Sequence, residues 1–334
     1  MDNTGKIFIT GSSGFIGSVL LEKLVQRGFH VKGLVRSLPK FKSDVGVEYI
    51  VGDLTDIELL RRGMRDCRYV FHLAAYAKNW SPNPKTYEQI NIEGTRHVFT
   101  AAKELNVERI VWTSTIVTLG PTPPNIIGNE TMPRITNHYF TKYEQTKTLM
   151  EQESIQWIKN GLPLVIVNPT RVYGPGLLSE SNTVSKLIND FRHGRFPFLL
   201  NRGVNIGNYG FVDDVAEGHL LAMEHGKIGE RYILGGENVS LEKLFQTVNV
   251  IDRKKRSQWK IYWIIPMIIA YYFQWRAQYF NIYPPITPGW LRTFLVDWAF
   301  SCDKAKQELG YSPTSFEEGI QKTCQWLDSL QDNN

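Results

Sequence analysis

The sequence has few cysteines and no long apolar run. Only three of its 334 residues are cysteines, Cys67, Cys302 and Cys324, and they are too far apart for a zinc motif. We therefore expect no metal site and reduced thiols, as in a cytoplasmic protein. The most apolar stretch, Ile261–Phe273, contains Pro266 and is too short to span a bilayer. We expect it to form an amphipathic lid or core helix, with contact to a membrane surface as the less favoured alternative.

Strong charge is also lacking. The net charge is +5, and the basic run Arg253–Arg256 is only four residues long. Such a run is typical of a solvated loop, so we expect no nucleic-acid partner. Repeats and low-complexity segments are absent, and the composition is that of an ordinary globular enzyme.

The first half of the chain alternates short β-branched runs with helical patterns, which predicts a parallel α/β fold. The expected strands are Lys6–Thr10, His30–Val35, Glu48–Val51, Tyr69–Leu73, Arg109–Thr113 and Leu164–Val167. The expected helices include Gly17–Arg27 and Asn91–Leu105. This pattern predicts a doubly wound Rossmann sheet with helices on both faces.

The composition changes after residue 168, where turns rich in proline and glycine begin. We expect residues 1–168 to form the Rossmann domain, and 169–334 to form a smaller α/β domain that would complete a ligand site. The segment 205–225, which contains a strand end and a helix, is expected to pack back on the first domain.

A glycine-rich turn follows the first strand and opens the first helix. It reads Thr10-Gly11-Ser12-Ser13-Gly14-Phe15-Ile16-Gly17. Gly11 permits a tight turn, Gly14 permits close approach of a pyrophosphate, and Gly17 permits the helix to pack on the strand. The helix N-terminus offers free N–H groups to an anion. The turn therefore predicts a dinucleotide site.

The residues after the second and third strands indicate the cofactor. NAD sites carry an acidic residue near the end of the second strand, but this chain has Arg36. A guanidinium suits a 2′-phosphate, with Ser12 as an additional hydroxyl contact, so we expect NADP, with NAD as the alternative. Asp53, which precedes Leu54, is expected either to accept from the adenine amino group or to cap the next helix. The small residues Ala74 and Ala75 leave room for the cofactor.

Tyr143 and Lys147 are four residues apart, so a helix would place both on one face. A phenol is a poor acid or base at neutral pH, and a nearby ammonium would lower its pKa. Thr113, Ser114 and Thr115 end a buried strand, where hydroxyl groups face the ligand crevice. These residues predict general acid–base chemistry on a substrate oxygen.

Taken together, these motifs resemble the extended short-chain dehydrogenase/reductase family, in the epimerase/dehydratase superfamily, over nearly the whole chain. The markers are the Gly11–Gly17 turn, Gly52-Asp53-Leu54, His72-Leu73-Ala74-Ala75, Asn91-Ile92-Glu93-Gly94-Thr95, Thr113-Ser114-Thr115, Tyr143 with Lys147, Asn168–Gly176, Phe211–Ala216 and Tyr311-Ser312-Pro313 with Glu318-Gly319-Ile320.

The resemblance implies a role for each marker. Tyr143 would be the general acid or base, Lys147 would lower its pKa and hold the nicotinamide ribose, and Thr115, helped by Ser114, would polarise the substrate oxygen. The implied cofactor contacts are Gly11, Ser12, Ser13, Gly14, Phe15, Ile16, Gly17, Arg36, Asp53, Leu54, Ala74, Ala75, Asn91, Thr113, Tyr143, Lys147, Pro169 and Val172. Such proteins typically dimerise through two helices, here Thr95–Leu105 and Tyr143–Lys159.

Within that family, the sequence is most similar to proteins that resemble dihydroflavonol 4-reductase and to a bacterial subgroup labelled hopanoid-associated sugar epimerases. Nucleotide-sugar epimerases usually carry an arginine where this chain has Gly207, and often a tyrosine where it has Leu119. Arg195 and Arg202 are nearby substitutes. Both departures favour a less charged, moderately apolar substrate, and the aromatic segment from Trp259 to Trp298 favours the same.

These patterns predict an enzyme, an NADP-dependent oxidoreductase that reduces a ketone or aldehyde with Tyr143 as the general acid. The alternative is an epimerase or dehydratase that acts on a nucleotide sugar and uses NAD cyclically. A protein that binds the cofactor without catalysis is the third and least favoured hypothesis, because it would not need Tyr143, Lys147 and Thr115.

Overall fold

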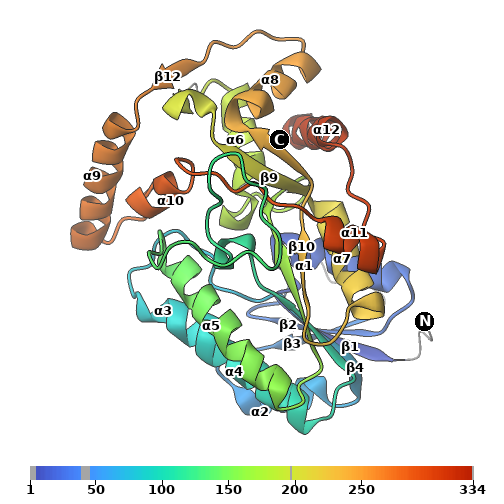
Figure 1. Ribbon diagram of the computed structural model, residues 1–334. Helices are drawn as coiled ribbons and strands as arrows, with labels where there is room; N and C mark the ends of the chain where they lie inside the picture. Colours follow the sequence, from blue (N-terminus) through green and yellow to red (C-terminus); the bar gives the residue numbers. More distant parts are fainter. Residues whose placement is uncertain (1–4, 39–45, 196–197, 333–334) are drawn as a thin grey trace.

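A parallel sheet forms the centre of the larger part of the molecule (Figure 1). The computed structural model describes residues 5–38, 46–195 and 198–332. The strands of this sheet are β1 (Lys6–Thr10), β2 (Val31–Val35), β3 (Val47–Val51), β4 (Cys67–His72), β5 (Arg109–Thr113), β6 (Leu164–Pro169) and β10 (Arg231–Leu234). Their order is β10-β6-β5-β4-β1-β2-β3, and all neighbours are parallel. This is the predicted Rossmann sheet.

Helices cover both faces of the sheet. One face carries α1 (Phe15–Gln26), α7 (Val212–His225) and α11 (Asp303–Leu309), and the other carries α2 (Ile57–Met64), α4 (Gly94–Glu104) and α5 (Lys142–Lys159). A short helix, α3 (Lys85–Glu88), and a π-helical turn, Gln89–Glu93, lead into α4.

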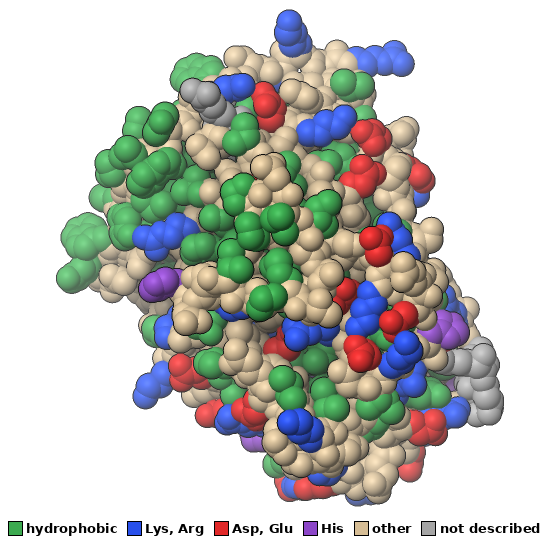
Figure 2. All heavy atoms as spheres, viewed as in Figure 1, with side chains coloured by type: hydrophobic (Ala, Val, Ile, Leu, Met, Phe, Trp, Pro, Cys, Tyr) green, Lys and Arg blue, Asp and Glu red, His purple; other side chains and the backbone are tan. Residues whose placement is uncertain are grey.

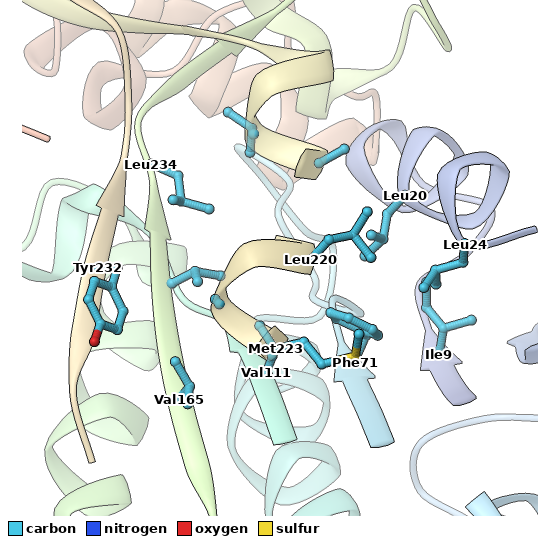
Figure 3. Packing of buried hydrophobic residues seen from close by; sticks show 14 of the residues in the cluster. Ile9, Leu20, Leu24, Phe71, Val111, Val165, Leu220, Met223, Tyr232 and Leu234 are labelled. Atoms are coloured by element: carbon cyan, nitrogen blue, oxygen red, sulfur yellow. The ribbon is translucent and has the colours of Figure 1, made fainter. Parts of the chain in front are cut away.

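Successive residues of β1 point into opposite cores, as in any strand covered on both faces. Ile7 and Ile9 lie in the core with α1 and α7, whereas Phe8 lies in the core with α2 and α4. Figure 3 shows the first of these cores, in which Leu20 and Leu24 of α1 and residues of α7 pack over the strands. Each such fully buried side chain contributes roughly 1.5–3 kcal/mol to stability.

A smaller lobe stands over the carboxyl-terminal edge of the sheet (Figure 1). Its main sheet contains β7 (Arg171–Tyr173), β9 (Ile206–Phe211) and β11 (Glu237–Ser240) in the order β11-β9-β7. The helices α6 (Thr183–Arg192), α8 (Leu241–Ile251) and α12 (Phe316–Asp332) pack against it. Phe191 and Phe245 stack at 4.2 Å between ring centroids in this second core. Short 3₁₀ turns lie at Ile116–Thr118, Glu180–Asn182 and Asn201–Gly203.

The chain returns to the large sheet after it has entered the lobe. The helix α7 packs on α1, and Val212 and Val215 lie in their shared core. The strand β9, which precedes α7, stays in the lobe sheet, although the sequence groups it with the returning segment. The strand β10 extends the large sheet beyond β6, and the sequence does not predict it.

The apolar segment of the lobe forms a longer helix than expected, α9 (Ile264–Phe280), between β12 (Trp259–Ile261) and α10 (Pro288–Arg292). The strand β12 pairs with β8 (Phe198–Leu200). Pro266 does not interrupt α9, because it lies in the first turn, where no intrahelical N–H bond is needed. Most apolar side chains of α9 are exposed, so it is not a core helix. Within the described ranges, none of the helices has the length and apolar character needed to cross a membrane.

Candidate cofactor and active site

A cavity of about 920 Å³ lies at the carboxyl-terminal edge of the large sheet. Its sheet side is formed by the Gly11–Gly17 turn and by residues that end β2, β3, β4 and β5. Its lobe side is formed by residues of β7 and α6 and by the segment from Trp290 to Trp298. In open α/β sheets this edge is where ligands bind.

The predicted cofactor residues converge on this cavity from seven separate segments. The residues that line it are Gly11, Ser13, Gly14, Phe15, Ile16, Gly17, Arg36, Asp53, Leu54, Ala74, Ala75, Thr113, Tyr143, Pro169 and Val172, together with Ser114 and Thr115. Three predicted residues do not line it: Ser12, Asn91 and Lys147.

The glycine turn forms a narrow backbone cradle. Gly11 has φ +76°, and a Cβ there would lie 2.7 Å from the backbone nitrogen of Ala74. A Cβ on Gly17 would overlap with the carbonyl oxygen of Gly11. Gly14 is the N-cap of α1, and no side chain caps this helix. The first N–H groups of α1 are therefore open toward the cavity, where they suit an anion.

Arg36 and Asp53 lie at the outer end of the sheet side. Arg36 is exposed, and among the described residues its guanidinium has no hydrogen-bond or ion-pair partner. Asp53 does not cap α2, because Asp56 does so by accepting from the backbone N–H of Leu59 at 2.9 Å. One oxygen of Asp53 instead accepts from the N–H and hydroxyl of Thr55.

Ser12 and Asn91 have structural positions that the sequence does not reveal. The Ser12 hydroxyl is buried beside Gly33 of β2 and has no hydrogen-bond partner. The expectation that it contacts the cofactor is therefore wrong in this structure, because it does not face the cavity. The Asn91 side chain accepts from the N–H of Tyr76 at 2.7 Å and donates to the hydroxyl of Thr146 at 3.0 Å. Asn91 thereby links Tyr76 in the cavity wall to Thr146 of α5, and it contributes to the site only by positioning these residues.

Tyr143 lies in the first turn of α5, and local capping explains why the helix begins there. The Thr141 hydroxyl accepts from the N–H of Glu144 at 3.1 Å, as in an N-cap. Tyr143 and Thr115 both line the cavity, and burial raises the pKa of Tyr143 to about 12, against a smaller opposite effect of the neighbouring Thr115 side chain. This differs from the expectation that Lys147 lowers the pKa of Tyr143. In the protein without cofactor, desolvation of the phenolate raises this pKa more than the neighbouring polar group lowers it.

Lys147 is almost completely buried, with 1% of its surface exposed. Its ammonium donates to the carbonyl oxygen of Thr113 at 2.8 Å and lies 4.4 Å from the ring centroid of Trp112. Burial lowers the pKa of Lys147 to about 7, although the nearby carboxylate of Glu151 acts in the opposite direction. Lys147 thus lies behind Thr113, which lines the cavity, and does not line it itself.

A buried polar cluster surrounds Glu151, which the sequence reasoning missed. Its Oε2 accepts from the hydroxyl of Ser114, from Thr118 at 2.8 Å and from the amide of Asn168 at 3.0 Å. Its Oε1 pairs with Arg231 of β10 at 3.0 Å. The Ser114 hydroxyl therefore donates to Glu151 and not toward the cavity. In the protein without cofactor, Ser114 is a positioning residue. The spacing Tyr143-x₃-Lys147-x₃-Glu151 was the available sequence signal.

Two buried histidines support the ends of the strands. His219 Nδ1 lies 2.7 Å from the carbonyl of Val215, so it carries the proton, and Nε2 accepts from the Thr113 hydroxyl at 2.9 Å. Burial lowers the pKa of His219 to about 4 and that of His72 to about 3. Both are neutral at physiological pH, and both act as fixed hydrogen-bonding groups.

The lobe side contains a cation that the sequence reasoning also missed. The guanidinium of Arg171 donates to the carbonyl of Thr293 at 2.8 Å and lies 4.6 Å from the ring centroid of Phe294. A Cβ on Gly207 would lie 2.9 Å from this guanidinium, so Gly207 leaves space for Arg171. Arg195 does not substitute for the absent arginine, because it pairs with Asp190 outside the cavity. The side chain of Arg202 lies outside the described part of the structure.

Comparison with known proteins agrees with this geometry. The family model of the NAD dependent epimerase/dehydratase family matches residues 7–235. The chain belongs to this family. It is 29% identical to a putative dihydroflavonol 4-reductase of Synechocystis sp., over 96% of this chain and 94% of the relative.

Two solved structures resemble this protein over nearly the whole chain. The crystal structure of gox2253 is 34% identical, with a TM-score of 0.81 and coverage of 98% of this chain and 99% of the other. The UDP-glucose 4-epimerase of Thermotoga maritima, solved with UDP-glucose, is 23% identical, with a TM-score of 0.78 and the same coverage. The second likeness shows the fold alone.

The sheet side fits the dinucleotide that this epimerase/dehydratase family uses. The cradle that Gly11 and Gly17 keep open has room for a pyrophosphate against the N-terminus of α1. The protein is thus an NAD(P)-dependent enzyme of the extended short-chain dehydrogenase/reductase type.

Proposed function

We propose that the protein is an NADP-dependent carbonyl reductase that converts a ketone or an aldehyde to an alcohol. The observation that carries this proposal is the placement of Tyr143 beside Thr115 in the wall of a cavity that also contains the glycine cradle. Two hydroxyl groups at this position can hold one carbonyl oxygen, and the similarity to the Synechocystis protein, a putative reductase, supports the same chemistry.

Tyr143 is the proposed proton donor. When bound, the reduced nicotinamide supplies a hydride to the carbonyl carbon, and the carbonyl oxygen then needs a proton. The raised pKa keeps the Tyr143 phenol protonated at neutral pH, so it has a proton to donate. Thr115 donates a hydrogen bond to the same oxygen and stabilises the developing negative charge.

Lys147 and Val172 have supporting roles in this proposal. Lys147 would hold the nicotinamide ribose and favour the phenolate that Tyr143 becomes after it donates its proton. The backbone of Val172, at the cavity wall, would meet the nicotinamide amide. Lys147 reaches the cavity only if its ammonium leaves the carbonyl of Thr113, which it contacts at 2.8 Å.

Arg36 supports NADP as the preferred cofactor. Its exposed guanidinium lies at the cavity wall at the end of β2 and, within the described residues, has no other partner. A 2′-phosphate would receive a charge-assisted bond there. NAD lacks this phosphate and would gain nothing from Arg36.

The lobe side favours a moderately apolar substrate. The rings of Trp290, Phe294 and Trp298 line it together with Leu177 and Val184. Apolar walls with a few polar groups are typical of small-molecule sites. Arg171 and Lys186 add positive charge, so an anionic group on the substrate is compatible with this wall.

The test is NADPH consumption with a panel of aldehydes and ketones. Tyr143→Phe is expected to reduce kcat about 10²- to 10⁴-fold while NADPH binding remains unchanged. Tyr279→Phe, on the exposed face of α9, is the matched control and should retain full activity. Unchanged turnover in Tyr143→Phe would remove Tyr143 from the mechanism.

An epimerase or dehydratase acting on a nucleotide sugar is the second candidate. Arg171 and Lys186 favour it, because both are cations in the wall where a diphosphate would lie. Such an enzyme retains its cofactor through the cycle. NAD(H) that copurifies and does not exchange with added nucleotide would support this candidate over the first.

A homodimer through α4 and α5 is part of the proposal. Arg96 of α4 and Glu153 of α5 pair at 2.6 Å, which holds the two helices together. Leu105, Leu149 and Ile155 are exposed on them. Light scattering of the purified chain should give the mass of two copies, and the mass of one copy would contradict the dimer.

A further inference from the structure

The helix α9 turns a broad apolar and aromatic surface away from the molecule. It stands at the margin of the lobe in Figure 1, and Figure 2 shows hydrophobic side chains gathered over the same side. The exposed apolar residues of this surface, which we call the α9 face, are Tyr262, Trp263, Ile264, Ile265, Ile268, Ile269, Tyr271, Tyr272, Trp275, Tyr279, Phe280, Ile282 and Tyr283. A contiguous apolar surface of this kind marks an interaction site.

Only a narrow stripe of α9 packs inward. Met267 and Ala270 are buried against Leu200 and Leu291 in a small core of the lobe. A helix that faces only water on its outer side would carry polar residues there. Ile265 and Ile268 instead expose 61% and 64% of their surfaces. Packing within the chain therefore does not explain why the exposed residues of α9 are apolar.

The segment that carries the α9 face has charged side chains of one sign only. Residues 253–296 contain seven lysines and arginines and no aspartate or glutamate. The whole chain has a net charge of only +5, so the remaining residues together are net acidic. Two of these cations have partners, since Arg256 pairs with Asp252 and Lys260 with Glu242. Arg253, Lys254 and Lys255 are exposed on the loop that leads to β12.

We propose that the α9 face binds the surface of an anionic lipid bilayer, with α9 lying parallel to the membrane. Isoleucines would enter the acyl boundary, while tryptophan and tyrosine rings have an apolar body and a polar tip that suit the headgroup level. The neighbouring lysines and arginines would meet anionic headgroups. The chain would then bind the membrane peripherally, which was the less favoured alternative for this segment from the sequence.

A second copy of the chain fits this surface less well. A two-fold contact brings the same patch of each copy together. Cations of residues 253–296 would then face each other with no carboxylate from the same segment between them. A bilayer with anionic headgroups supplies the missing negative charge.

The α9 face adjoins the rim of the cavity. The hydroxyl of Tyr283 donates to the carboxylate of Glu180, which lines the cavity. Arg292 donates to the hydroxyl of Tyr271 at 2.7 Å, just before Phe294 enters the cavity wall. Membrane binding would therefore bring the cavity opening close to the lipid, where an apolar substrate would be concentrated. The binding proposal itself does not depend on the reaction.

Cosedimentation of the full chain with vesicles tests the proposal without cofactor or substrate. We expect binding to phosphatidylcholine vesicles that contain phosphatidylserine, and weaker binding to phosphatidylcholine alone. The triple variant Ile265→Ser/Ile268→Ser/Tyr272→Ser should bind at least about tenfold more weakly. The control Ile127→Ser/Ile135→Ser/Ile228→Ser changes side chains of similar exposure on other surfaces and should bind normally.

A charge variant separates the electrostatic contribution to membrane binding from the apolar contribution. Arg253→Gln/Lys254→Gln/Lys255→Gln should weaken binding to vesicles with phosphatidylserine and leave binding to phosphatidylcholine unchanged. Failure of the unmodified chain to sediment with either vesicle would overturn the proposal. Self-association that the apolar triple variant abolishes, in a chain that ignores vesicles, would also overturn it and assign the α9 face to a second copy.

Discussion

The two sides of the cavity differ in how tightly their residues are held. On the sheet side, Gly11 and Gly17 leave no space for a Cβ, and Lys147 is fixed by one short bond to a strand carbonyl. On the lobe side, the wall consists of aromatic rings and the long side chains of Arg171 and Lys186. A rigid cradle suits a ligand of constant shape, whereas rings and long side chains can adapt to different substrates.

The same difference explains which parts of the site are visible in the sequence. The glycine turn and the Tyr143/Lys147 pair are local patterns, because a turn and a helix bring nearby residues together. Because the sheet side would hold the cofactor and the lobe side the substrate, substitutions on the two sides should affect cofactor binding and substrate binding separately.

The largest effect is expected for Gly17→Ala. Its Cβ would overlap with the carbonyl oxygen of Gly11, so the turn must open and the pyrophosphate contacts move. We expect NADPH affinity, measured by fluorescence titration, to fall at least about 100-fold. Gly161→Ala is the control: its φ of +88° strains the backbone there, but the added Cβ meets no atom within 4 Å and lies outside the cavity, so NADPH binding should be retained. Equal affinities in the two variants would show that the cradle is not rigid.

Arg36→Gln tests cofactor choice on the sheet side. Loss of a hydrogen bond to a charged phosphate should weaken NADPH binding about 10- to 100-fold. The affinity for NADH should not change, because NADH has no 2′-phosphate. Arg62→Gln, which replaces an exposed arginine outside the cavity, is the control. An equal loss of affinity for NADPH and for NADH would argue against selection of NADP by Arg36.

Phe294→Ala tests the lobe side. It removes a ring from the substrate wall, so KM for the best carbonyl substrate should rise about tenfold while the Kd of NADPH stays constant. Phe280→Ala removes an exposed ring of α9 and should change neither value. A large loss of NADPH affinity in Phe294→Ala would mean that the two sides are not separate.

The pH dependence of stability tests the sheet side without any ligand. The folded pKa of Lys147 is about 7, below its ordinary value of 10.5, so between these values the unfolded chain binds a proton that the folded chain does not. The free energy of unfolding therefore gains a contribution that grows as pH rises from about 7 to 10. Lys147→Met should lose this rise in denaturant titrations, whereas Lys142→Met, at an exposed position, should keep it. Identical profiles for all three proteins would place the pKa of Lys147 near its ordinary value.

The sequence predicts the fold well where the signals are local. The bounds of β1 and β5 match the expected strands, because each is a short β-branched run. The strand β10 was missed because it has only four residues and joins the sheet through a long-range pairing with β6. The helix α9 was misjudged because periodicity does not tell whether an apolar helix faces a core or the solvent.

The site shows the same limit. The cluster around Glu151 joins residues from β5, α5, β6 and β10, and Arg171 lies beside Gly207 only because β7 pairs with β9. Such neighbours arise from tertiary packing and leave no local pattern. Ser12 was misplaced because the turn directs its side chain toward β2, which no spacing rule describes.

Transfer of deuterium from NADPH labelled at carbon 4 of the nicotinamide tests the central claim most directly. A carbonyl reductase should place one deuterium on the carbinol carbon of the product and form one NADP⁺ for each alcohol. Tyr143→Phe should slow this transfer without loss of NADPH binding. Product formation without net oxidation of added nucleotide, with any label retained on a tightly bound cofactor, would contradict the reductase and favour the epimerase or dehydratase.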